Sequence, residues 1–146
     1  MTSFIWALQL GSTLYMVGLI WFVQLVHYPL MSSVGEGSYR EYQQRHMRWT
    51  GVAVGPAMLL EALTSVALLW AKPPAVPLWV VWLGVALLGV VWGSTALLQV
   101  PSHQRLLEGF EAKAHRHLVY TNVLRTLAWS ARGVLLLAAN AGFFSG

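Results

Sequence analysis

The sequence predicts an all-α integral membrane protein, folded as a single antiparallel bundle of four helices over residues 1–146. Of these residues 57% are hydrophobic and only 10% are charged, whereas soluble domains carry about a quarter charged residues. Four long apolar segments are each of the length, roughly 20 residues, that crosses a hydrocarbon core of about 30 Å. We expect the membrane spans at about residues 4–28, 50–71, 77–100 and 117–139.

The first apolar segment is expected to be a retained helix rather than a cleaved signal peptide. Three uncharged residues precede it, so it lacks a basic n-region, and it is too long for a signal h-region. It ends in His27-Tyr28-Pro29, where a proline is tolerated near a helix end. Beyond the turn over residues 32–37, Ser38 and Glu41 fit a capping box, which predicts that the next helix begins at Tyr39.

The second span is expected to continue a helix that protrudes into the cytoplasm through His46. Gly55-Pro56 predicts a local kink inside this span. Glu61 is the only acidic residue in any predicted span, and the helical rise would place it about 14 Å deep. A buried carboxylate needs a partner, so we expect Glu61 to pair with Arg125 or Arg132.

The third span is expected to end at Pro101, which would break the helix near the interface. Its last turns present one polar helical face, made of Trp92, Thr95, Gln99 and His103. Small residues spaced four apart permit close contact between helices. The second span carries this pattern as Gly51-x-x-x-Gly55 and the third as Gly89-x-x-x-Gly93.

The fourth span has a polar face whose members follow one another at spacings of four, four, four and three, namely His117, Thr121, Arg125, Trp129 and Arg132. Every other segment of the chain is more hydrophobic still. A face that carries two arginines in such surroundings is therefore expected to look inward, onto the other helices.

Lysine and arginine counts predict the orientation. Six basic residues lie in the two connections that join spans one to two and three to four, Arg40, Arg45, Arg48, Arg105, Lys113 and Arg116. The opposite connection holds Lys72 alone. By the positive-inside rule both termini lie outside and the basic connections are cytoplasmic, which fits a prokaryotic inner membrane. The net charge of +4 is then a topology signal, with no nucleic-acid pattern in it.

All five histidines lie near the helix ends on this predicted cytoplasmic side, His27, His46, His103, His115 and His117. One hypothesis is a metal site (copper, iron or zinc) or a haem site built from His27, His46 and His103, with His117 undecided. Gln24 and Gln99 would then orient the rings. The alternative is that these are interfacial histidines, solvated or bonded to phosphate, and we favour it for His115. With no cysteine, disulfides and thiolate sites are excluded.

Three short segments carry a further signal: Gln99 to Leu106, Asn122 to Thr126 and Val26 to Leu30. They are similar, in that order, to the motifs N-x-P-x-N-x-x-L, W-N-x-x-R-T and V-x-P-x-L, and so resemble the anthrone-oxygenase-like family of small four-helix membrane proteins. The resemblance implies a pocket for an aromatic substrate and an oxygenation without a recognised cofactor. The histidines depart from the family pattern, since His103 stands in place of an amide, and they favour a variant that acquired a metal.

Three functions follow as hypotheses. The first is a membrane oxidoreductase of the oxygenase type that acts on a small hydrophobic or aromatic molecule, with Glu61, Asn122 and Arg125 as catalytic residues. Its cofactor-binding residues would be Gln24, Gln99, Trp92 and Trp129. The second is a non-catalytic metal- or haem-binding protein, and the third is a structural accessory subunit. All three hypotheses place the chain in the lipid bilayer, and all three are compatible with a homo-oligomer.

Overall fold

The computed structural model describes residues 1–144, which form four continuous helical rods and no strand. The first rod joins α1 (Thr2–Phe22), the π-helical η1 (Val23–His27), α2 (Tyr28–Leu30) and the 3-10 turn η2 (Met31–Ser33). The second rod is α3 (Glu36–Ala71). The third joins α4 (Leu78–Ser94), the π-helical η3 (Thr95–Gln99) and α5 (Val100–Leu106), and the fourth is α6 (Ala112–Asn140).

Three of these rods are long and apolar enough to cross a membrane: Thr2–Ser33, Glu36–Ala71 and Leu78–Leu106. The expected all-helical class is thereby confirmed, and three of the four expected spans lie within helices of the length and apolarity that a span requires. The fourth rod, α6, is long enough at 29 residues, but its central arginines make it more polar than the others. Its membrane span therefore stays a prediction, as do the antiparallel arrangement and the location of the termini.

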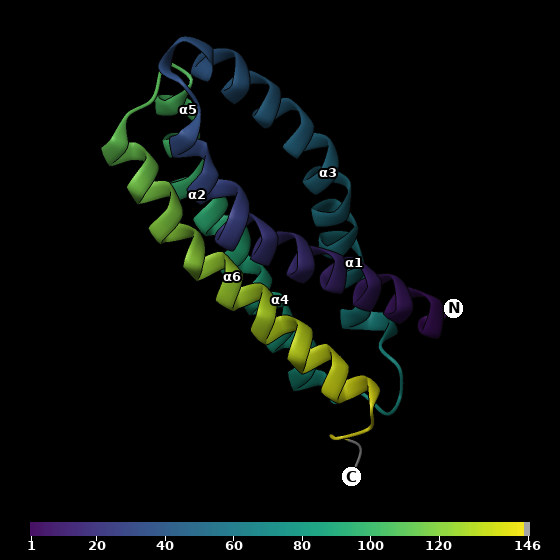
Figure 1. Cartoon of the computed structure of the whole chain (residues 1–146). Coiled ribbons are helices and arrows are strands. Elements are labelled where there is room, and N and C mark those ends of the chain that lie inside the picture. The colour runs from purple at the N-terminus through teal and green to yellow at the C-terminus, as the bar shows by residue number, and fades with distance from the viewer. Residues whose placement is uncertain (145–146) are drawn as a thin grey trace.

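The rods pack into one bundle, in which α4 runs alongside α6 (Figure 1). Helix α1 contacts α3 and α6, and α4 contacts α6. At one end, Trp6 Nε1 donates a hydrogen bond to Asn140 Oδ1 across 3.0 Å. At the other end, the connection at Gly35 and the connection at Gly109 lie near each other, and Arg40 Nε donates to the carbonyl oxygen of Glu108 across 2.8 Å.

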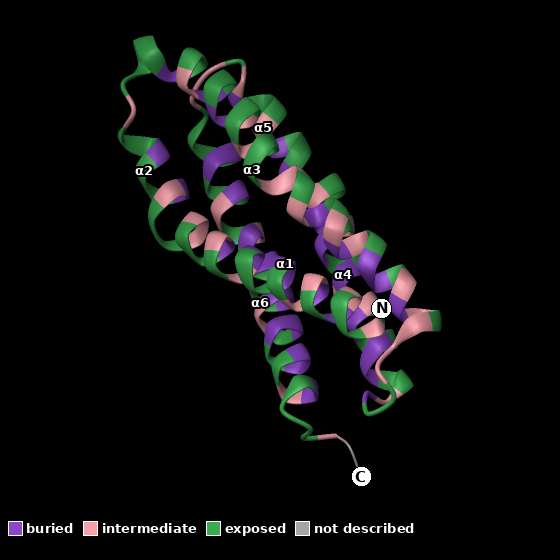
Figure 2. Ribbon diagram, turned by 90° about the vertical axis from the view of Figure 1, so that its right-hand side faces the viewer, coloured by how far each residue is buried: buried purple, intermediate pink, exposed green. Residues whose placement is uncertain are grey.

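Buried residues form the inner faces of the rods, and exposed residues form their outer faces (Figure 2). Many exposed side chains are large and apolar, for example Trp70 at 80% exposure and Leu63 at 69%. A water-soluble monomer rarely leaves so many large apolar side chains uncovered. The outer surface of the bundle is thus suited to lipid.

The prediction that Pro101 breaks the helix is wrong. The rod continues to Leu106, and the proline follows the π segment Thr95–Gln99. Pro29 follows the π segment Val23–His27 in the same way. A proline has no N–H to donate, and its ring crowds the carbonyl four residues earlier, so a wider turn absorbs it without ending the helix.

Other expected local features also differ from the structure. Helix α3 begins at Glu36, with Gly35 as a cap residue that makes no side-chain cap bond, so the expected capping box and start at Tyr39 are wrong. The helix runs on through Pro56 without interruption.

The four glycines of the small-residue patterns do not mediate close helix contacts. A Cβ added at Gly51, Gly55, Gly89 or Gly93 would meet no atom within 4 Å. The close approach lies elsewhere, at Gly133, where a Cβ would lie 3.1 Å from Val17 Cγ2. The pattern is frequent in apolar helices, and here the approaching surfaces are the inner faces of α1 and α6.

Candidate functional site

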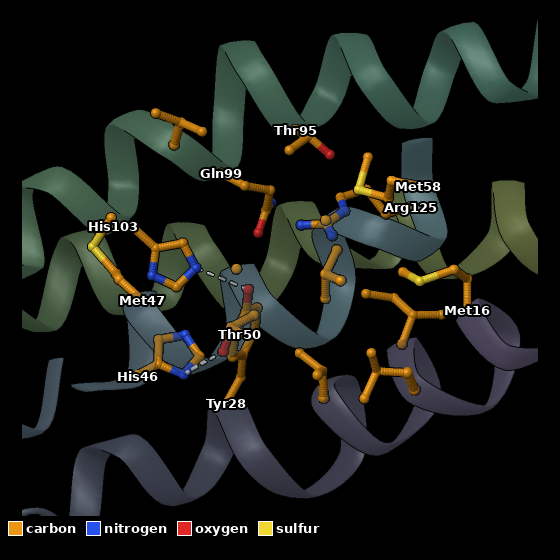
Figure 3. Close-up of a pocket in the computed structure, with 17 residues that line it drawn as sticks. Met16, Tyr28, His46, Met47, Thr50, Met58, Thr95, Gln99, His103 and Arg125 are labelled. Atoms are coloured by element: carbon orange, nitrogen blue, oxygen red, sulfur yellow. Dashed lines mark hydrogen bonds between the residues drawn. The ribbon is translucent and has the colours of Figure 1, made fainter. Parts of the chain in front are cut away.

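A cavity of about 240 Å³ lies between the four rods, toward the end that holds the basic connections (Figure 3). Most of its wall is apolar, contributed by α1 and α3, and includes Met16, Ile20, Val54 and Met58. Its polar lining comes from all four rods, as Tyr28, His46, Thr50, Thr95, Gln99, His103 and Arg125. An apolar cavity with a few converging polar groups is the usual form of a small-molecule site.

Arg125 brings a buried cation to this cavity from α6. Its Nε has no hydrogen-bond partner among the described residues, and no carboxylate of that part of the chain pairs with it. The guanidinium lies 5.2 Å from the ring centroid of Trp129 and interacts with the phenol of Tyr28. In Figure 3 Arg125, Gln99 and Tyr28 point toward the same part of the cavity.

Tyr28 and His103 form a hydrogen-bonded pair at the cavity wall, with 3.0 Å between the phenol oxygen and Nε2. On its other side the His103 ring faces Gln43, whose Nε2 lies 3.0 Å from Nδ1. The buried Oε1 of Gln43 has no partner. As placed, Gln43 Nε2 also donates to the carbonyl oxygen of His103, across 3.3 Å. A half-turn of the amide would give up that bond and present Oε1 to Nδ1, which would leave the Nε2 of His103 able to take up the Tyr28 proton.

His27 and His46 form a second pair, with 2.8 Å between His27 Nε2 and His46 Nδ1. Their rings are stacked at 4.6 Å, and His103 lies 5.1 Å from His46 between ring centroids. Thr50 Oγ1 also contacts His46 Nδ1, across 3.1 Å. A hydrogen bond between two imidazoles needs one unprotonated nitrogen, so the two rings share protons rather than both carrying a charge.

The rings of His27, His46 and His103 lie next to one another, but their nitrogens face one another and their neighbours. Among residues 1–144 no group of three or more His, Asp or Glu side chains is arranged to hold a metal ion. A metal at this cluster would have to replace the bond between His27 and His46. Metal binding stays a prediction.

Glu61 belongs to a separate polar network, nearer the chain termini. The prediction that it contacts an arginine inside the bundle is confirmed, and the partner is Arg132, with 3.3 Å between Arg132 Nε and Glu61 Oε1. Thr13 Oγ1 and Trp129 Nε1 also donate to this carboxylate, across 2.6 and 2.9 Å. Both charged side chains are at most 1% exposed.

Arg132 uses its remaining donors inside the same network. Nη1 donates to the carbonyl oxygen of Gly84 and Nη2 to Ser65 Oγ. Ser65 and Thr64 in turn donate to Gln9 Oε1, so the network joins all four rods. Every polar group in it has a partner, as a structural polar core requires.

Several residues expected at one site lie apart from it. Trp92 is exposed and borders a shallow surface depression beside Leu88. Gln24 orients no histidine, since it donates to the carbonyl oxygen of Val119 and accepts from Asn122 Nδ2. Gln99 also contacts no histidine and donates to Thr121 Oγ1 across 2.8 Å. Trp92 does not face the cavity with Thr95, Gln99 and His103, because the π turn after Ser94 rotates those later residues relative to Trp92.

The two histidines of α6 also behave differently from the other three. His117 is largely exposed and its Nδ1 contacts Ser102 Oγ across 3.0 Å, so it does not join the histidine cluster. His115, expected to be solvated, is instead buried, and its Nε2 donates to the carbonyl oxygen of Tyr28 across 2.7 Å. The expectation that His115 is solvated was wrong because the start of α6 packs against α2.

Three site residues were not predicted: Tyr28, Gln43 and Thr50. The sequence carries a weak signal for two of them, because Gln43 and Thr50 lie three and four residues from His46 on one face of α3. Tyr28 is adjacent to His27 and lies on the inner face only because of the π turn before it.

Comparisons with protein family models, with curated proteins and with solved structures found no match for this chain.

Proposed function

We propose that this chain is a membrane-embedded oxidoreductase of the oxygenase type, which binds a small aromatic molecule in the cavity of Figure 3 and oxidises it there. The observation that carries the proposal is the joining of an apolar wall to the Tyr28–His103 pair and Arg125 within one cavity. The volume of about 240 Å³ lies just below the usual range for ligand sites of about 300–1,000 Å³, which favours a small molecule.

The proposed chemistry begins with a proton. The substrate carries an acidified CH₂ group between aryl rings, and the Tyr28–His103 pair takes up its proton, the phenol receiving it as its own proton passes to Nε2. The resulting carbanion reacts with dioxygen, the co-reactant. Loss of one water then leaves a carbonyl, so that R₂CH₂ and O₂ give R₂CO and H₂O. The resemblance to the anthrone-oxygenase-like family supports this reaction class.

The other expected catalytic residues have supporting roles in this proposal. Glu61 holds the helices together through Arg132, and Asn122 holds Gln24 of η1 against α6. Of the expected catalytic set, Arg125 alone lines the cavity.

The second candidate is a metal or haem site at His27, His46 and His103. The observation that favours it is the proximity of three imidazoles from three rods, with centroids 4.6 Å apart for His27 and His46 and 5.1 Å apart for His46 and His103. Copper, iron, zinc or haem iron all accept imidazole ligands.

In either case we propose an antiparallel bundle in the lipid bilayer with α6 as the fourth span. The burial of Arg125, Trp129 and Arg132 supports this placement, because it hides the polar face of α6 from lipid.

Filling the cavity tests the proposed function. Gly55 lines it, and a Cβ added there would meet no atom within 4 Å, so the side chain of Gly55→Leu should reduce the space in the cavity. The matched control is Gly93→Leu, at an equally open glycine outside the cavity lining. With protein in mild detergent, anthrone binding would be measured by tryptophan quenching, and turnover by oxygen consumption.

We expect wild type and Gly93→Leu to bind and oxidise anthrone, and Gly55→Leu to bind at least about tenfold more weakly. Equal behaviour of all three proteins would contradict the proposal. Metal analysis and an absorption spectrum of the same samples separate the second candidate. Stoichiometric metal or a Soret band that disappears in His46→Ala, without oxygen consumption, would establish it instead.

A further inference from the structure

The buried charges of the described residues do not balance. Among the described Asp, Glu, Lys and Arg residues, those that are buried are Glu61, Arg125 and Arg132. Glu61 and Arg132 neutralise each other within their network. Arg125 is left as a buried cation without a counter-ion, 7% exposed and bordering the cavity. A buried charge is normally paired, so this one indicates a missing anion.

A second observation points to a ligand at the same place. Gln99 is 1% exposed, lines the cavity from η3, and its buried Oε1 has no hydrogen-bond partner. The Nε of Arg125 is likewise buried without one. Unpaired buried polar atoms are rare in folded proteins. Here the Arg125 donor suits an anionic oxygen, whereas the Gln99 acceptor suits a hydroxyl or N–H group elsewhere on the same ligand.

The contacts that Arg125 does make leave the position of an anion open. The ring of Trp129 stabilises one face of the guanidinium, at 5.2 Å, but supplies no charge. Tyr28 offers a neutral hydroxyl that is bonded to His103. Planar guanidinium groups bind carboxylates with two parallel N–H···O bonds and can also donate to the single oxygen of a phenolate or enolate. The low dielectric of an apolar cavity strengthens the attraction.

From these observations we infer that the cavity stabilises the anionic form of its ligand through Arg125: a small aromatic acid, a phenolate, or the enolate that the proposed deprotonation produces. The inference rests on the proposed function only in placing an aromatic ligand in this cavity. It adds the charge state of that ligand and assigns its recognition to one residue.

The test compares two aromatic probes of the same shape, 2-naphthoate and 2-naphthamide, which differ in charge. Binding would be measured by equilibrium dialysis at pH 7.5 with the full chain in a mild uncharged detergent. Arg125→Met removes the cation and keeps the length of the side chain, and Arg125→Lys restores a cation without the planar fork. Arg116→Met, at an exposed arginine on the same helix, is the matched control.

We expect wild type and Arg116→Met to bind naphthoate at least about tenfold more tightly than naphthamide. Arg125→Met should lose this preference while it keeps its affinity for naphthamide, and Arg125→Lys should recover part of it. Equal binding of the two probes by wild type would overturn the inference even if Arg125→Met failed to fold. A preference that survives in folded Arg125→Met would overturn it as well.

The two proposals can fail separately. If both probes bind equally and Gly55→Leu abolishes both, the aromatic site stands and its anion selectivity is wrong. If neither probe binds and Gly55→Leu also leaves anthrone binding and oxidation unchanged, the cavity is not a ligand site, and the proposed function fails together with this inference.

Discussion

At the scale of single residues, two arginines of α6 have opposite roles although seven residues separate them on one helical face. Arg132 meets the Glu61 carboxylate, the Gly84 carbonyl and Ser65, so each of its nitrogens has a buried partner. Arg125 meets an aromatic ring and a cavity. Arg132, whose charge is paired and whose nitrogens all have partners, therefore has a structural role, whereas Arg125 is left available to a ligand.

The first prediction is that the two arginines contribute differently to the thermal stability of the bundle. Removing one partner of a buried ion pair typically costs roughly 3–5 kcal/mol. Glu61→Gln and Arg132→Met should each lower the thermal unfolding midpoint in detergent strongly, and Arg125→Met should lower it less. The double variant Glu61→Gln/Arg132→Met should be less destabilised than the sum of its parts. Additive losses, or a loss in Arg125→Met as large as in Arg132→Met, would contradict the assignment of partners.

The sequence allowed the position of these residues in the bundle to be predicted, but not the partners that they contact. Glu61 could be expected inside the bundle because it is the one acidic residue in an apolar segment. Its partner could not be chosen, since Arg125 and Arg132 share a helical face and the choice depends on where Gly84 and Ser65 lie. The convergence of His27, His46 and His103 followed from the topology. The bonds of Tyr28, Gln43 and Thr50 depend on rotamers and could not be predicted.

At the scale of elements, the two π segments determine which residues face the cavity. Each precedes a proline by the same distance, Val23–His27 before Pro29 and Thr95–Gln99 before Pro101. A π turn adds a residue to the helical turn and so rotates the following part of the helix. Hydropathy predicts the rods well, but it assumes a regular 3.6-residue period. This is why the expected face of Trp92, Thr95, Gln99 and His103 was only partly right.

The second prediction tests the role of the π segment. Pro101→Ala should let Thr95–Gln99 relax toward a regular α-helix, which moves Gln99 relative to Arg125. Affinity for the aromatic probe should then fall by about tenfold without loss of thermal stability. The control is Pro56→Ala, at a proline inside α3 without a π segment, which should leave affinity unchanged. If both variants bind the probe like wild type, the π segment does not position the cavity lining.

At the scale of the whole molecule, the polar groups form successive layers along the bundle. The Glu61 network lies toward the termini, the cavity with Arg125 comes next, and the histidine cluster lies closest to the basic connections. In the proposed reaction, a proton taken up by His103 would lie near His46 and its partner His27, which is only partly buried. The order of the layers would suit transfer of that proton from the cavity toward the surface at the basic end.

The last prediction is the orientation of this layered bundle in the membrane. Six basic residues lie in the two connections at one end, against Lys72 at the other, and Arg40 bonds directly to the second basic connection at Glu108. Because basic loops stay on the cytoplasmic side, a reporter inserted at Gly35 should be cytoplasmic, and reporters at both termini should be outside. Replacing Arg45 and Arg48 by Gln should reduce the fraction in this orientation, whereas Lys72→Gln should not. A cytoplasmic C-terminal reporter would contradict the four-span topology, since it would leave α6 either outside the bilayer or inserted the other way.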